Sequence, residues 1–129
     1  MKLSRIFFLF LLLFLFVPSV SYAQSAASKS WNPFWTQFKS AVKNKNKVSI
    51  KRLMSSESEF ITVGGIASRN DFMKMLNEKG YWKDLQDSID EGIASYTSDK
   101  GRPARRTKNK YLSFEYIGGK WRFIGLFGD

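Results

Sequence analysis

A pair of glycines close to the carboxyl end constrains the fold of this chain more than any other feature. Gly118 and Gly119 separate two runs rich in aromatic and β-branched residues, 111–117 and 120–127, and this pattern favours the two-residue turn of a β-hairpin. Such a turn fixes the register of its strands. The predicted cross-strand pairs are Ile117 with Lys120, Tyr116 with Trp121, Glu115 with Arg122, Phe114 with Phe123, Ser113 with Ile124, and Leu112 with Gly125.

This register sorts the hairpin side chains by face, because successive side chains of a strand point to opposite sides. One face holds the aromatic pairs and is expected to join the core, while Glu115 and Arg122 are expected to form an ion pair on the other. An exposed apolar patch rimmed by charge is typical of an interface. The outer face therefore predicts a two-fold homodimer, through its apolar residues Tyr111, Ile117, Ile124 and Leu126.

The amino end has the pattern of an export signal. Lys2 and Arg5 flank the start of an unbroken apolar run, 6–17, and residues 21–23 read Ser-Tyr-Ala, with small residues at the −3 and −1 positions of a cleavage site. Cleavage is expected after Ala23, so that 1–23 is a signal peptide and the protein is secreted or periplasmic. The run of 12 residues is shorter than the roughly 20 that span a bilayer as a helix. An uncleaved signal anchor is the alternative, and no membrane span is expected after cleavage.

Composition excludes several chemistries. The 129 residues contain no Cys and no His, which excludes thiol nucleophiles, imidazole metal ligands and Ser-His triads. We also find no glycine-rich phosphate loop and no dinucleotide fingerprint. No catalytic residue, cofactor or metal is therefore predicted. The net charge of +10 should attract the protein to anionic surfaces.

The first half of the mature chain predicts two helices. Residues 24–30 are small and polar and predict a flexible lead-in, so the folded domain is expected over 31–129. Asn32 is expected to cap the first helix, with Pro33 in its first position. A short helix, 47–54, is expected to follow, with Asn46 as its cap. Its inward residues are expected to be Val48 and Leu53, with Ile50 off that stripe, and the first helix carries its own apolar stripe, Phe34, Trp35, Phe38, Ala41 and Val42.

The middle of the chain predicts two strands and two further helices. Residues 59–66 are rich in β-branched residues and predict a strand, and 93–97 predict another. Ser68 and Asp71 have the spacing of a capping box, so a helix is expected to start there and to end at Gly80. The last helix, 81–91, carries Trp82, Leu85 and Ile89 on one face.

Residues 98–110 predict a long loop. Gly101 and Pro103 disfavour a central strand, and the charges of six basic residues should repel one another and keep the segment extended. Two interpretations stay open: a solvated face, or a mobile contact to anionic polymers of the cell envelope. Nucleic acid is disfavoured as a partner by export. The six basic residues are Lys100, Arg102, Arg105, Arg106, Lys108 and Lys110.

The order of these elements resembles the nuclear-transport-factor-two-like (cystatin-like) superfamily. Residues 34–43, read as FWTQFKSAVK, are followed by 48–54 and closed by 120–124, read as KWRFI. This arrangement is similar to small exported bacterial members whose function is uncharacterised. The resemblance implies a single α+β domain with N-terminal helices packed on a curved antiparallel sheet that ends in a hairpin. It also implies a cone-like shape whose open end can hold a pocket.

Function follows less directly from these patterns. The first expectation is an exported, non-enzymatic binding or interaction module for a small apolar ligand. The alternatives are a pocket enzyme of the isomerase or dehydratase kind, for which Glu59 is the acid that could face inward, and a basic module that docks on anionic envelope polymers. Six aromatic residues are expected either to fill the core or to line a pocket: Trp35, Phe38, Trp82, Tyr96, Tyr116 and Trp121.

Overall fold

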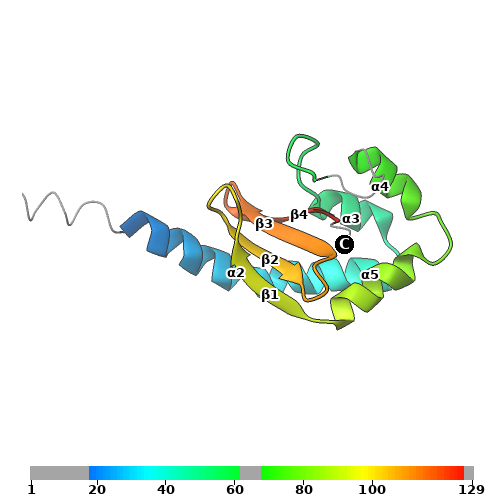
Figure 1. Cartoon of the computed structure of the whole chain (residues 1–129), viewed down its shortest axis with the longest axis horizontal. Coiled ribbons are helices and arrows are strands. Elements are labelled where there is room, and N and C mark those ends of the chain that lie inside the picture. The colour runs from blue at the N-terminus through cyan, green and yellow to red at the C-terminus, as the bar shows by residue number, and fades with distance from the viewer. Residues whose placement is uncertain (1–17, 62–67, 127–129) are drawn as a thin grey trace, which may run out of the picture.

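The structure, a computed structural model, describes residues 18–61 and 68–126. Within them, four helices precede one antiparallel sheet of four strands in the order β1-β2-β3-β4. Helix α2 runs behind the sheet (Figure 1). Helices α3, α4 and α5 lie at the end of the molecule opposite to the start of α2 (Figure 1). The predicted α+β class, with N-terminal helices and a closing hairpin, is confirmed. The elements are α2 (Pro18–Lys43), α3 (Lys47–Leu53), α4 (Arg69–Met75), α5 (Tyr81–Asp90), β1 (Ile93–Thr97), β2 (Pro103–Thr107), β3 (Leu112–Ile117) and β4 (Lys120–Leu126).

The core between the helices and the sheet is built mainly from aromatic rings. Phe38 of α2 packs on Phe114 and Phe123 of the hairpin, with ring centroids 4.9 and 5.2 Å apart. Phe72 of α4 approaches Phe123 to 5.3 Å, and all four rings are fully buried. Since a buried Phe contributes roughly 1.5–3 kcal/mol, these contacts hold the helices against the sheet in a chain that has no disulfide.

The hairpin register is as predicted for the four pairs nearest the turn, and the two outer pairs are wrong. A β-bulge pairs Ser113 with Gly125 and Leu112 with Leu126. Met54 and Ile61 form parallel bridges to β4 beside the bulge, and the Ile61 N–H donates to the Ile124 carbonyl at 2.6 Å. A Cβ on Gly125 would lie 2.4 Å from the Ile61 carbonyl oxygen, so only glycine fits this crossing.

The bulge also changes the outer face of the hairpin. Leu126 turns into the core, Ile124 is buried, and Tyr111 packs against the core while its hydroxyl lies 3.2 Å from that of Tyr81. The described residues thus lack the exposed apolar patch that was expected there. The homodimer prediction was based on this patch, so it stays a prediction without that observation to support it.

Helix α2 begins earlier than predicted. It starts at Pro18 and contains Pro33 in its interior, so residues 24–30 are helical and Asn32 is not its cap. The reason is tertiary packing, because Ala27 and Trp31 are buried and extend the apolar stripe by two turns toward the amino end. The Trp121 indole also donates to the Ala27 carbonyl at 2.8 Å. These contacts outweigh the cost of about 3 kcal/mol for an interior proline.

The shorter helices have the predicted caps, but α4 ends at Met75 and not at Gly80, which instead precedes α5 as its N-cap. Asn46 caps α3 by accepting from the Ser49 N–H, and Ser68 caps α4 by accepting from the Asp71 N–H, as predicted. The predicted inward face of α3 is wrong, since Ile50 is fully buried whereas Val48 is 68% exposed. Most of the strand expected over 59–66 lies outside the described residues, although Ile61 forms a parallel bridge with Gly125.

The prediction of a long loop over 98–110 is wrong, because this segment contains strand β2. This strand lies between β1 and β3 and pairs antiparallel with both. Pro103 is its first residue, a position where the missing N–H is tolerated. Gly101, with φ of 74°, forms the turn that joins β1 to β2. The segment is therefore part of the fold and not a mobile extension.

Candidate functional site

A groove of about 510 Å³ lies between the first half of α2 and the β1–β2 hairpin. Its apolar wall includes Ala27 and Trp121, both buried, and its opposite side is polar. A small molecule with one apolar and one polar part matches such a lining. The residues around it are Ala23, Gln24, Ala27, Ser28, Ser95, Tyr96, Thr97, Gly101, Pro103, Ala104, Arg105 and Trp121.

The groove exists because α2 and the sheet are joined at this end of the molecule. The hydrogen bond from the Trp121 indole to the Ala27 carbonyl fixes α2 against β4. Trp31 packs edge-on against Trp121, with ring centroids 4.8 Å apart. In the sheet, Ser95 of β1 lies directly opposite Arg105 of β2, so these two side chains share the face that looks toward α2.

Arg105 is the cation of this groove. Its guanidinium carbon lies 4.8 Å from the Trp31 ring centroid and 5.8 Å from that of Trp121. Partial burial lowers the pKa of Arg105, although an arginine stays charged at any physiological pH. Among the described residues no carboxylate forms an ion pair with it. The guanidinium is held by aromatic rings and keeps its hydrogen-bonding capacity for an anion.

Tyr96 lines both the groove and a hollow on the outer sheet face. Burial raises the pKa of its hydroxyl, which keeps it protonated and able to donate a hydrogen bond at neutral pH. The Arg106 guanidinium lies 4.9 Å from the Tyr96 ring centroid. This cation–π contact places both Arg106 and the Tyr96 ring on the outer sheet face, opposite to Arg105, so the Tyr96 hydroxyl faces the outer hollow and not the groove.

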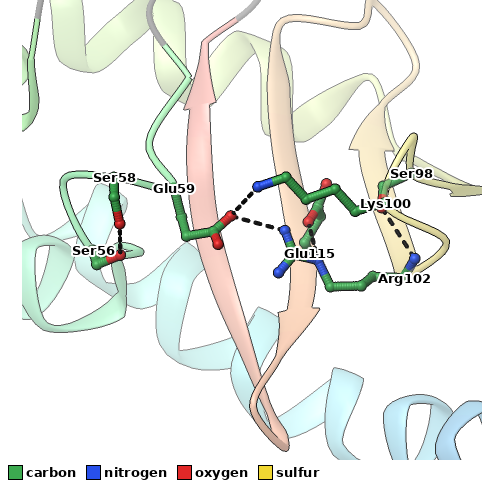
Figure 2. A network of polar contacts seen from close by, with 7 residues as sticks. All are labelled: Ser56, Ser58, Glu59, Ser98, Lys100, Arg102 and Glu115. Atoms are coloured by element: carbon green, nitrogen blue, oxygen red, sulfur yellow. Dashed lines mark hydrogen bonds and ion pairs between the residues drawn. The ribbon is translucent and has the colours of Figure 1, made fainter.

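Behind the groove, on the outer sheet face, four charged side chains form a cluster that we call the clasp: Glu59, Lys100, Arg102 and Glu115. Figure 2 shows Glu59, from the segment beside β4, reaching over the sheet toward the β1–β2 turn. Lys100 Nζ and Arg102 Nη2 each lie 2.8 Å from Glu59 Oε2. Arg102 Nε is 2.8 Å from Glu115 Oε2, an ion pair without hydrogen-bond alignment.

The clasp joins three parts of the chain that are distant in sequence. Hydrogen bonds from Arg102 and then from Lys100 lower the pKa of Glu59 to about 2. Glu115 is buried at 6% exposure, so the nearby Arg102 charge offsets the cost of placing a carboxylate inside the protein. Glu115 and Arg122 are cross-strand partners, but the expected ion pair between them is wrong, because Glu115 pairs with Arg102 and Arg122 donates to the Arg52 carbonyl at 3.1 Å.

The clasp also limits what acid–base chemistry the site can perform. A second hollow, of about 480 Å³, lies on the outer sheet face and contains Glu115, Tyr96 and Asp99. Glu115 is engaged by Arg102 and Glu59 is engaged by two cations. No carboxylate among the described residues lines the first groove.

The structure separates the six basic residues of 98–110. Lys100 and Arg102 belong to the clasp, while Arg105 and Arg106 stack on aromatic rings on opposite faces of the sheet. Lys108 and Lys110 are exposed. The six side chains therefore form no common surface.

The six aromatic residues proposed for a pocket are also separated. Phe38 is fully buried in the core, and Trp35, Trp82 and Tyr116 are half-buried and pack against it. Trp82 also lines a third hollow, beside α5. Tyr96 and Trp121 line the first groove. Sequence reasoning missed the groove's wall on α2, although the spacing of Ala27 and Trp31 before Phe34 continues the helical stripe and could have revealed it.

Comparison of the chain with models of known protein families, with curated proteins and with solved structures finds no match. Within residues 18–61 and 68–126, no cluster of three or more acidic side chains could hold a metal ion. The helices in these residues are too short or too polar to cross a bilayer.

Proposed function

We propose that this protein is an exported, non-enzymatic binding module whose groove takes a small amphipathic anion. The anionic group, a carboxylate or a similar acid, is held by Arg105 and by the neighbouring Ser95 hydroxyl. The apolar part lies along Ala27 and Trp121. The observation that carries the proposal is Arg105 itself, a half-buried guanidinium on two indole rings with no acidic partner among the described residues.

Charge and geometry together support this ligand class. A guanidinium offers donors in a planar fork that matches a carboxylate, and partial removal from water strengthens such a contact. The groove's volume of about 510 Å³ falls in the range of small-molecule sites. Export is supported by the sequence pattern of residues 1–23, and cleavage after Ala23 leaves Gln24, Ala27 and Ser28 in the groove. The cone-like superfamily fold remains a prediction from the resemblance.

Titration calorimetry with octanoate and its neutral counterpart octan-1-ol tests the proposal. We expect octanoate to bind the protein and octan-1-ol to bind at least tenfold more weakly, because only octanoate carries the charge. Arg105→Gln should weaken octanoate binding by about 10- to 100-fold, since a hydrogen bond to a charged group contributes about 1.5–3 kcal/mol. Arg105→Lys should fall between the two proteins, because lysine keeps the charge without the fork.

Lys108→Gln is the matched control, since it removes one positive charge from the same segment outside the groove. This variant should bind octanoate like the wild type. Two results would contradict the proposal: equal binding of octanoate and octan-1-ol, or unchanged octanoate binding by Arg105→Gln. Either would show that Arg105 only packs on the two tryptophan rings and does not bind the anion.

The pocket-enzyme alternative is less well supported. It needs a carboxylate free to accept a proton beside the ligand; Glu59 and Glu115 are paired with cations, and Asp99 lines the outer hollow and not the groove. The low pKa of Glu59, about 2, makes it a weak base at neutral pH.

A further inference from the structure

The end of the molecule away from the groove carries a concentration of positive charge. Residues 24–56 include seven Lys and Arg residues and no Asp or Glu. Six of the seven fall between residues 39 and 52, around the turn that joins α2 to α3. An acid-free stretch of this length on folded helices differs from an ordinary solvated surface, where charges of both signs are interspersed.

Lysines from two parts of the chain meet at this end. Lys43, Lys45 and Lys47, at the α2–α3 turn, line a hollow of about 990 Å³ together with Lys79, which precedes α5, and Lys83, in its first turn. We call these five residues the lysine rim. Within the described residues only Lys83 has an acidic partner, Asp87, at 2.5 Å. The other four ammonium groups form no ion pair among the described residues. The same hollow is also lined by two carboxylates, Glu78 and Asp87, so five lysines against two acids leave a net positive charge there.

Apolar side chains accompany these charges. The lining of the hollow includes Trp82, which is half-buried, and Leu76, which is buried in the core. Val48, directly after Lys47, is 68% exposed in the first turn of α3. A large apolar residue exposed to this degree next to unpaired lysines is the pattern of a surface that meets both headgroup charge and acyl chains.

From this juxtaposition we infer that the lysine rim and Val48 form a peripheral docking surface for an anionic lipid bilayer. Lysines contact phosphate groups and Val48 enters the boundary between headgroups and acyl chains. A soluble polyanion would satisfy the charges but would leave Val48 in water, which is why the bilayer is the better partner. The proposal goes beyond ligand binding in the groove and does not depend on it.

The two surfaces are compatible with each other in space. The groove contacts residues 23–28 of α2 and the lysine rim begins at Lys43, so at 1.5 Å per helical residue they lie roughly 25 Å apart along α2. Figure 1 shows the start of α2 and the α3–α5 end at opposite ends of the molecule. A protein docked through the lysine rim keeps its groove open to solvent.

Vesicle co-sedimentation with the mature chain tests the inference. We expect binding to vesicles of equal parts phosphatidylglycerol and phosphatidylcholine, and no binding to phosphatidylcholine alone. Each lysine near an anionic surface strengthens binding about fivefold, so the triple variant Lys43→Gln, Lys45→Gln, Lys47→Gln should bind on the order of a hundredfold more weakly. Val48→Ser should weaken binding several-fold and leave its salt dependence unchanged.

The matched control is Lys108→Gln, Lys110→Gln, Lys120→Gln, which removes the same charge from exposed positions outside the lysine rim. It should keep vesicle affinity within about fivefold of the wild type, and all variants should keep the wild-type circular dichroism spectrum. Equal loss in the two triple variants would overturn the inference, because charge alone would then explain binding. So would wild-type affinity of Val48→Ser together with equally tight binding of soluble polyphosphate, which would identify a polyanion as the partner.

Octanoate binding separates this inference from the proposed function. The Lys43, Lys45, Lys47 variant should bind octanoate like the wild type, and Arg105→Gln should keep its vesicle binding. Each experiment can thus fail without the other.

Discussion

Two basic segments of this protein look alike in the sequence and differ in the structure. Residues 98–110 and residues 39–52 each carry six Lys or Arg side chains. In the first segment four of the six contact acids or aromatic rings, in the clasp and on Trp31, Trp121 and Tyr96. In the second, Lys39 lies 5.7 Å from the Trp35 ring centroid, and no residue forms an ion pair among the described residues.

The difference comes from the secondary structure that each segment adopts. A strand sends successive side chains to opposite faces, so β2 directs Arg105 toward α2 and Arg106 toward the outer face, where partners from distant parts of the chain meet them. The α2–α3 turn lies at the edge of the fold, where Lys45 with φ of 52° reverses the chain and its neighbours point to solvent. The positive side chains of 98–110 therefore mostly make contacts within the fold, whereas those of 39–52 mostly face solvent.

Replacement of Arg102 by Met should give the largest stability loss that this comparison implies. The change leaves Glu115 buried without its cation, which costs several kcal/mol for a fully buried pair. Because the Arg102 side chain is 23% exposed, partial screening reduces the expected loss to about 2–3 kcal/mol. The free energy of unfolding, from denaturant titration, measures it.

Lys47→Met is the matched control for Arg102→Met, since it makes the same kind of change in the other basic segment. It should shift the unfolding free energy by no more than about 0.5 kcal/mol. If Arg102→Met unfolds at the wild-type denaturant concentration, the clasp is a surface contact and the contrast between the two segments disappears.

The acid sensitivity of the clasp sharpens the same comparison. Hydrogen bonds from Arg102 and Lys100 lower the pKa of Glu59 from 4.5 to about 2, so the unfolded chain binds more protons than the folded one between these values. This contribution to stability is complete above about pH 4.5 and is lost as the pH falls toward 2. The wild type should lose more stability between pH 6 and pH 3 than Glu59→Gln does, as read from denaturant midpoints.

Other carboxylates also titrate in this range, so the difference between wild type and Glu59→Gln is the informative quantity. Parallel loss in the two proteins would mean that Glu59 is not tied to Arg102 and Lys100 in solution.

The features that the sequence predicts well depend on residues close together in the chain. The inner hairpin pairs follow from Gly118-Gly119 alone, and the caps at Asn46 and Ser68 follow from side chains within three residues of the groups they bind. The bulge beside Gly125 could not be predicted from local signals, because it accompanies a contact with Ile61, which is distant in the sequence. For the same reason the burial of Ile124 and Leu126 was missed.

The candidate site depends on contacts of the same long-range kind. Arg105 meets Trp31 and Trp121, and Arg102 meets Glu59, which is 43 residues away. Pro103 and the many charged residues of 98–110 disfavoured a strand there. The alternating faces of β2 can be recognised only once its neighbouring strands are known. The start of α2 is different, since the four-three-four spacing of Ala27, Trp31, Phe34 and Phe38 is present in the sequence and outweighs the signal of Pro33.

The smallest expected effect concerns the stability of the lysine rim. The triple variant Lys43→Gln, Lys45→Gln, Lys47→Gln should unfold within about 0.5 kcal/mol of the wild type, because none of these side chains has an acidic partner within the described residues and glutamine keeps the length of the stem. Removing three like charges should raise stability slightly at low salt, since it relieves repulsion. Denaturant midpoints at low and high salt measure both effects. A clear loss of stability would mean that these lysines, like Arg102, hold the fold together, and that the two basic segments differ less than their contacts indicate.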